Sequence, residues 1–275
     1  MTAGWQRLST RTGSRRPDEL YEGVPVHLRH PLEEWIRTRF GWHNRGPRGM
    51  NDQFMATVAS TLRIPVARTH EIGGISSQIF NAINRDEALY LNCVDLCLYL
   101  SRSGAGDLES ILDTGGSVWT VNTAKDGLER RVDATTKSSF VQATSPADQA
   151  SKELAEAWAA VYGRSPDPSD GWDHSIKAVE ALLIPLVVPN QSKPNLGHVA
   201  GQLKSDPSRW SFGLPANDAR GNGETLEGMI RHIWPNPDRH GGASQRPPTQ
   251  EEAEAVLQVA IAIIELCRGK LVKLP

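Results

Sequence analysis

Apolar residues in the first hundred positions recur every three or four residues, which is the spacing of one face of an α-helix. The predicted helices span 28–40, 51–62 and 84–100. Asn51 is the expected N-cap of the second helix, because its side chain can accept a hydrogen bond from the first turn. Asn84 and Glu87 have the spacing of a capping box and mark the expected start of the third helix.

The pattern changes after residue 116. SVWTV and LERRVD are short runs that contain β-branched residues, and the segment NTAKDG between them includes the turn signal Asp126-Gly127. These features predict a β-hairpin over 117–133. The next stretch, TTKSSFVQATSPAD, is rich in serine and threonine and includes a proline. We therefore place a domain boundary near residue 146.

Helical spacing of apolar residues returns in the second half. The predicted helices span 148–162, 172–184, 195–203, 224–234 and 249–267. Ser145 and Asp148 are the expected cap of the first, and Thr249 with Glu252 forms a capping box for the last. Pro185 is expected to end or kink the second of these helices. The fourth ends near Trp234, the residue before a proline.

The pattern as a whole predicts a mainly α protein with two domains. A flexible lead-in over 1–17 precedes a helical domain over 18–145, which ends in the small hairpin. A second helical domain covers 146–275. The last helix is apolar on nearly every side, and this indicates either a central position in its own bundle or a face covered by another copy.

Composition narrows the function classes. The chain has 275 residues and a net charge of −2, so no bulk basic field attracts nucleic acid. Cys93 and Cys97 lie on one helix face and are interpreted as core thiols, which fits a reducing, cytoplasmic setting. We find no signal peptide, no membrane-spanning run and no P-loop. No cofactor and no metal ion are expected.

The stretch RHIWPNPDRHGG, residues 231–242, is the main candidate for chemistry. His240 can take up and release a proton near neutral pH. Arg231 or Arg239 can bind a phosphate group through a rigid fork of donors. Asn236 can orient the histidine or donate to phosphate. Together these groups are sufficient for cleavage of RNA without metal.

Simpler interpretations stand beside this one. In the first of them, Asn236 and Asp238 cap a loop while the charged groups face water. The loop GWHNRGPRG can contact phosphate or be solvated, and the pair Arg130–Arg131 can contact an RNA backbone or lie on the surface. A cluster of acids and a histidine at 170–174 is explained by the start of a helix rather than by a metal site.

Three pieces of the second half resemble, in this order, the HEPN superfamily of helical domains, particularly those that end bacterial abortive-infection proteins. WDHSIKAVEAL is similar to an early helix of that domain, and NLGHVAGQL to a short Leu-Gly helix that follows. NPDRHGG before a capped helix is similar to the turn that bears the site. The helices and hairpin of the first half resemble the domains that precede HEPN in those proteins.

The resemblance implies a metal-independent ribonuclease or RNA-targeting effector. The signature of active HEPN domains is an arginine, a polar residue, three free positions and a histidine. With His240 as the histidine, Asn236 takes the polar position but Pro235 stands where the arginine belongs. Either Arg231 or Arg239 supplies the missing guanidinium, or the domain is catalytically inactive and binds protein or nucleic acid.

The resemblance also implies partners. Active HEPN domains pair, so we expect a homodimer through the second half of the chain, with RNA as the substrate. In the inactive alternative the domain serves binding or a structural place in an assembly. In both cases the first half is expected to recognise a protein partner that the sequence does not identify, and no membrane is expected.

Overall fold

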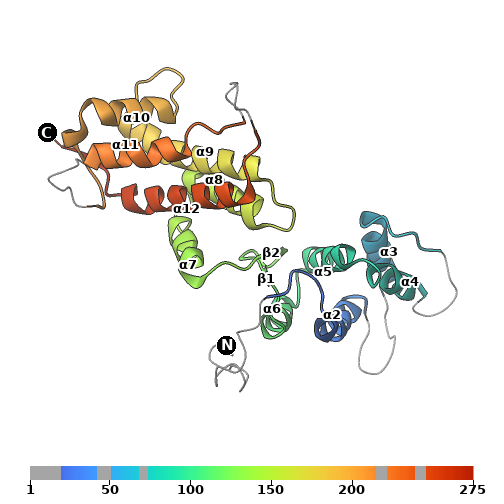
Figure 1. The fold of residues 1–275 in the computed structure, drawn as a ribbon. Helices are drawn as coiled ribbons and strands as arrows, with labels where there is room; N and C mark the ends of the chain where they lie inside the picture. Colours follow the sequence, from blue (N-terminus) through green and yellow to red (C-terminus); the bar gives the residue numbers. More distant parts are fainter. Residues whose placement is uncertain (1–19, 42–50, 68–73, 215–221, 239–245, 275) are drawn as a thin grey trace, which may run out of the picture. The chain divides into compact units, whose positions relative to one another are not determined.

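The computed structural model describes residues 20–41, 51–67, 74–214, 222–238 and 246–274, and the predicted lead-in lies outside them. The chain divides into two compact units, Met1–Arg131 and Val132–Pro275, each with its own hydrophobic core. Helices dominate both units, so the prediction of a mainly α protein is confirmed (Figure 1). No helix in the described segments has the length and apolar character needed to cross a membrane.

The first unit packs its helices around one apolar core. The elements are α2 (Val26–Arg39), α3 (Asp52–Thr61), α4 (Gly74–Ile83), α5 (Glu87–Ser101) and α6 (Ala105–Thr114). The three predicted helices are present, and Asn51 caps α3 by accepting a hydrogen bond from Phe54 N at 2.9 Å. Asp86, not Asn84, caps α5, through a 3.0 Å bond from Leu89 N. Cys93 and Cys97 are buried free thiols in the core.

The predicted hairpin is present and closes the first unit. Strand β1 (Trp119–Val121) pairs antiparallel with β2 (Leu128–Arg130), and Trp119 lies opposite Arg130. The side chain of Asp95 on α5 accepts a 2.6 Å hydrogen bond from Leu128 N. This bond fastens the second strand to the helical core.

The second unit begins before the predicted boundary at 146. Residues 134–143 form a helix, α7 (Ala134–Ala143), whose start is capped by Asp133. Phe140 stacks on Trp158 with ring centroids 4.1 Å apart, and both belong to the core of the second unit. The serine- and threonine-rich stretch that looked like a linker is therefore part of this unit, because its aromatic side chain covers a buried tryptophan.

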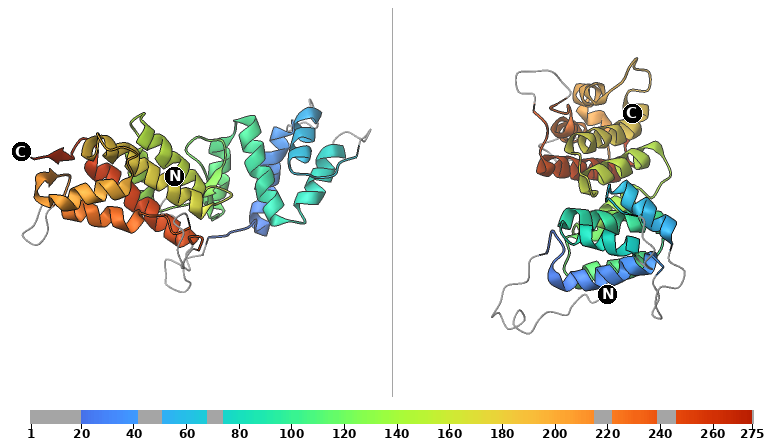
Figure 2. Two further views of the ribbon diagram at one scale, coloured as in Figure 1. Left: turned by 90° about the horizontal axis from the view of Figure 1, so that it is seen from above. Right: turned by 90° about the vertical axis from the view of Figure 1, so that its right-hand side faces the viewer.

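The remaining helices form a bundle around α12. They are α8 (Gln149–Tyr162), α9 (Pro168–Val187), α10 (Leu196–Ser205), α11 (Asn222–Ile233) and α12 (Gln250–Cys267). A strand pair, β3 (Trp210–Ser211) with β4 (Val272–Lys273), lies beside them. Figure 2 shows α8, α9 and α12 side by side, and α12 also contacts α7 and α11.

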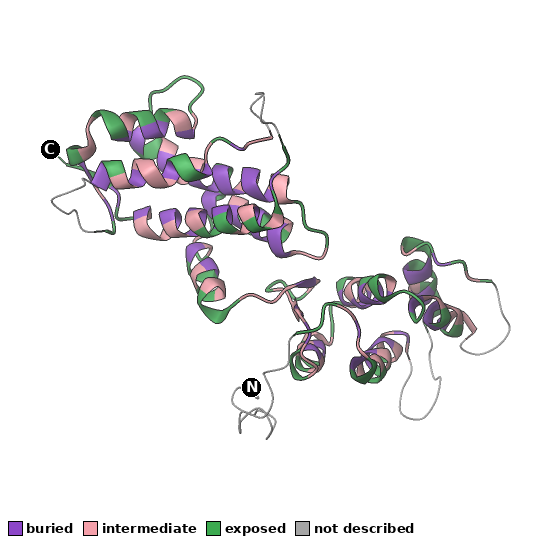
Figure 3. Ribbon diagram, viewed as in Figure 1, coloured by how far each residue is buried: buried purple, intermediate pink, exposed green. Residues whose placement is uncertain are grey.

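Helix boundaries in this unit follow the expected caps. Asp148, without Ser145, caps α8, and Thr249 with Glu252 forms the predicted capping box of α12. Helix α9 begins four residues earlier than predicted, and Pro185 lies inside its last turn instead of ending it. The apolar residues of α12 are covered along one face of the helix, whereas Ala255 and Gln258 on its other side are exposed; buried and exposed residues are both visible on this helix in Figure 3. Neighbouring helices of the same unit supply that cover.

Candidate functional site

The turn after α11 is folded back onto the first turns of α9. The peptide bond between Trp234 and Pro235 is cis, and the next residue, Asn236, is only 2% exposed. Its side-chain Nδ2 donates to Asp173 Oδ1 at 2.7 Å and to the carbonyl oxygen of Ser169 at 3.3 Å. A buried amide that satisfies its donors in this way is a strong anchor, since an unpaired one would be costly.

Two further hydrogen bonds complete what we call the polar clasp, formed by Ser169, Asp173, Asn236 and Asp238. The hydroxyl of Ser169 donates to the carboxylate of Asp238. The backbone N–H of Asp238 donates to Asn236 Oδ1 at 3.3 Å. Beside the clasp, Trp172 Nε1 donates to the carbonyl oxygen of Ile233 at 2.6 Å. The clasp and the Trp172 bond together fix the chain from the last residue of α11 to residue 238.

Local sequence explains why α9 presents these groups together. Asp167 caps the helix by accepting from Asp170 N at 3.0 Å, and Pro168 fits the first helical position, where no donor is needed. Ser169, Trp172 and Asp173 then follow at spacings of three and four residues. Residues with that spacing lie on one face of a helix. The face that carries the clasp is thus fixed by the start of α9.

Trp234, just before the turn, packs on α10. A methyl group added at Gly197 would lie 2.6 Å from the Trp234 ring, so the ring rests directly on the glycine. At the start of α10, Leu196 N donates to Glu180 on α9 at 3.0 Å. Burial raises the pKa of the Glu180 carboxyl, and the negative charge of Asp173 raises it further. This side of α9 therefore carries acidic groups, which repel a phosphate unless a cation stands between them.

Of the four predicted site residues, the structure describes two. Arg231 is on the exposed side of the last turn of α11, where its Nε donates to Glu227 Oε1 at 2.5 Å. Asn236 is buried against α9, so the structure does not bring these two side chains together. Arg239 and His240 lie outside the described residues.

The environment of Asn236 changes the role expected for it. Both amide donors are used by α9, and the amide oxygen accepts from the backbone of Asp238. Any effect of Asn236 on His240 therefore acts through the position of the turn. Ser169 and Asp173, which hold the amide, were not identified from sequence as partners of it, although their helical spacing on an apolar helix was a visible signal.

In the cluster of acids and a histidine at 170–174, the histidine forms an ion pair with a glutamate of another helix. His174 Nδ1 lies 2.7 Å from Glu153 Oε2 on α8, whereas Asp173 belongs to the polar clasp. Burial opposes ionisation of Glu153, but hydrogen bonds from His174 and Gln149 lower its pKa overall. Among the residues that the structure describes, no group of three or more His, Cys, Asp or Glu side chains is arranged to hold a metal ion.

The two arginines of the hairpin are also paired. Arg130 binds Glu22 at 2.7 Å, and Arg131 lies 3.3 Å from Asp113. These pairs occupy the guanidinium groups that had been considered for RNA backbone contact. The polar loop GWHNRGPRG falls almost entirely outside the described residues.

Comparison with known proteins identifies no similar protein. The chain matches no family model, no curated protein and no solved structure. The polar clasp and the turn that it holds are therefore the basis for a functional proposal.

Proposed function

We propose that the second unit is a HEPN-like helical bundle that acts as a metal-independent ribonuclease or RNA-targeting effector of the abortive-infection or toxin type. The polar clasp is the observation that supports it. Four side chains fix the turn up to Asp238, immediately before Arg239 and His240 in sequence. A reacting histidine needs a rigid attachment, because loss of geometry of about 1 Å can lower a rate a hundredfold.

The chemistry requires two kinds of group. His240 removes the proton of a ribose 2′-hydroxyl or donates one to the leaving 5′-oxygen. The 2′-oxygen attacks the neighbouring phosphorus, and the bond from phosphorus to the 5′-oxygen breaks. A guanidinium group stabilises the charge on the phosphate during this step. In this proposal Arg231 or Arg239 supplies the guanidinium, and Asn236 holds the turn.

Arg231 is exposed, which suits it to binding a phosphate, but its side chain is already paired with Glu227. Its single hydrogen bond to Glu227 uses Nε and leaves the terminal nitrogens without a partner among the described residues. A phosphate group can therefore be bound by those nitrogens while Glu227 stays in place. We further propose that two copies pair through the second unit, so that two histidines and two arginines share one cleft.

The deciding experiment is cleavage of total cellular RNA and tRNA by the purified full chain in EDTA. Wild type is compared with His240→Ala and with His198→Ala, a matched control at an exposed histidine on α10. We expect cleavage by wild type and by His198→Ala, and loss of at least about a hundredfold in His240→Ala. Equal cleavage by all three, or none by any folded sample, contradicts the proposal.

A second candidate is a catalytically inactive module that binds protein or nucleic acid or has a structural place in an assembly. Two observations favour it. Pro235 occupies the position of the signature arginine, and Arg231 is already paired with Glu227. In that case the first unit carries recognition. A folded dimer that binds RNA or a protein partner but leaves RNA intact in the same assay supports this candidate.

A further inference from the structure

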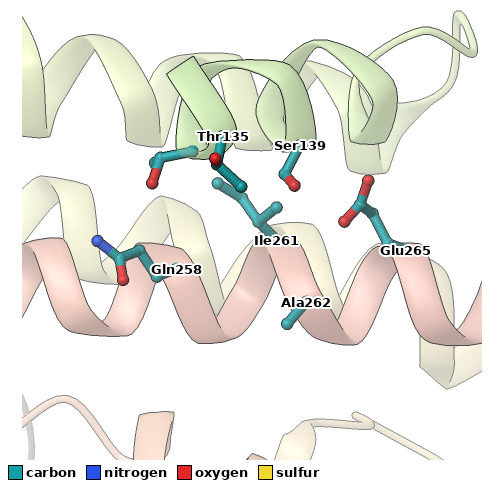
Figure 4. A pocket seen from close by; sticks show the side chains of 7 residues that line it. Thr135, Ser139, Gln258, Ile261, Ala262 and Glu265 are labelled. Atoms are coloured by element: carbon teal, nitrogen blue, oxygen red, sulfur yellow. The ribbon is translucent and has the colours of Figure 1, made fainter. Parts of the chain in front are cut away.

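A shallow cavity of about 160 Å³ lies between α7 and α12, on the second unit alone. Its main lining residues are Thr135, Thr136, Ser139, Gln258, Ile261 and Glu265. Figure 4 shows Thr135 and Ser139 descending from α7 while Ile261 and Glu265 rise from α12 to meet them. We call this cavity the α7–α12 groove. It shares no residue with the polar clasp.

The lining selects a class of ligand. It contains hydroxyl, amide and carboxylate groups but no lysine, arginine or histidine. An anion would find no positive charge there, so phosphate and carboxylate ligands are disfavoured. A ligand that both donates and accepts hydrogen bonds fits the hydroxyls of Thr135 and Ser139, and the partly exposed Ala262 adds a small apolar surface for a C–H face. These properties together describe a sugar ring.

Glu265 is the residue that makes the groove specific. It lies in the last turn of α12, where a negative side chain faces the negative end of the helix dipole and is disfavoured. Lys270 donates to its backbone oxygen at 3.2 Å, and no described residue pairs with its carboxylate. Stability therefore does not explain a carboxylate here, and its two oxygens are available to accept from neighbouring hydroxyls.

Size limits the ligand further. The cavity has room for roughly five water molecules at liquid density. That volume accommodates one five- or six-membered ring. Gln258 lies at one end of the groove (Figure 4). A base or chain attached to the ring would have to project into solvent.

We propose that the α7–α12 groove binds a ribose through its vicinal diol, with Glu265 accepting hydrogen bonds from two adjacent hydroxyls and Ser139 and Gln258 completing the contacts. Acidic side chains bind ribose hydroxyls in this way in dinucleotide sites. The diol occurs on free nucleosides and at the 3′ end of RNA. The proposal stands independently of the ribonuclease, because it uses none of the residues assigned to cleavage.

The test is ligand-detected NMR with methyl β-D-ribofuranoside and its 2-deoxy analogue on the full chain. Wild type, Glu265→Gln and Ser138→Ala are compared; Ser138 is exposed on α7 and does not line the groove. We expect the riboside to bind wild type and Ser138→Ala alike. Binding should fall about tenfold or more in Glu265→Gln and for the 2-deoxy analogue, the loss of one good hydrogen bond.

Competition then separates the two sources of ribose. Adenosine is compared with a short RNA that ends in a 3′-hydroxyl and with the same RNA ending in a 3′-phosphate. Displacement by the 3′-hydroxyl RNA but not by the 3′-phosphate RNA assigns the groove to RNA ends, and displacement by adenosine alone assigns it to nucleosides. The proposal is overturned if the riboside does not bind or if the 2-deoxy analogue binds equally well. It is also overturned if the groove prefers putrescine, a diamine cation without hydroxyl groups.

Discussion

Asn236 shows how a single side chain can link distant parts of this chain. It hydrogen-bonds residues 63 and 67 positions earlier and is almost fully buried. Sequence identified it as a polar residue in a turn, with a site role or a capping role left open. Its burial was not predictable, because spacing along the chain reports only neighbours within one helix or turn. The partner appears only once α9 and the turn are brought together.

Removal of either side of the buried bond is expected to destabilise the second unit. Asn236→Ala removes the 2.7 Å hydrogen bond to the buried Asp173 carboxylate, at a cost of about 1–3 kcal/mol in the free energy of unfolding. Asp173→Ala should cost a similar amount, and the double variant less than the sum. Urea unfolding measures all three, with Gln142→Ala on the surface as the control. Strict additivity would mean that the two side chains do not interact.

Glu252 gives a prediction about pH. Its hydrogen bonds from Arg246 and from Thr249 N lower the pKa to about 2, from 4.5. Because the folded pKa lies below the unfolded one, this stabilisation is present above pH 4.5 and is lost as pH falls towards 2. Arg246→Gln should move the Glu252 pKa upward in an NMR titration while that of Glu153 stays unchanged. An unshifted Glu252 pKa would show that the pair does not form in solution.

At the scale of elements, caps were easier to predict than helices with weak propensity. Asn51, Asp148 and the Thr249–Glu252 box mark real helix starts because capping is a local interaction. Helix α7 was missed since serine and threonine favour turns over helix interiors. Packing of Phe140 on Trp158 overrides that preference, and no local signal reports such a contact.

Helix α10 offers a matched pair of glycines. Gly197→Ala should destabilise the protein, because the new methyl group would lie 2.6 Å from the Trp234 ring. Gly201→Ala, in the same helix with nothing within 4 Å, should stabilise it by about 0.5–1 kcal/mol through helix propensity. Thermal unfolding of both variants checks this. Stabilisation by both would mean that Trp234 does not rest on α10.

At the scale of the whole molecule, the chain consists of two units with separate cores. The number and order of the units were predictable from the change of pattern at the hairpin. Their boundary was not, because composition makes α7 look like a linker. The second unit begins 14 residues before the predicted boundary at 146, and this difference should change the stability of an isolated fragment.

A fragment that starts at residue 132 is expected to fold, and one that starts at 146 is not expected to reach the same stability. The shorter fragment lacks α7, so it exposes Trp158 and part of α12 to water. Loss of a buried phenylalanine alone costs about 3–5 kcal/mol, a large share of the stability of a domain. Circular dichroism and urea unfolding compare the two, with the full chain as reference. Equal stability would place α7 outside the second unit.

The polar clasp also constrains how this sequence can change over time. A substitution at Asn236 alone removes a donor from the buried Asp173 carboxylate, and a substitution at Asp173 alone removes the nearer of the two acceptors of the Asn236 amide. Each single step is therefore selected against, even where neither residue touches a substrate. Among descendants and relatives of this chain, positions 173 and 236 should be inherited as a pair: both polar and complementary, or both replaced by apolar residues.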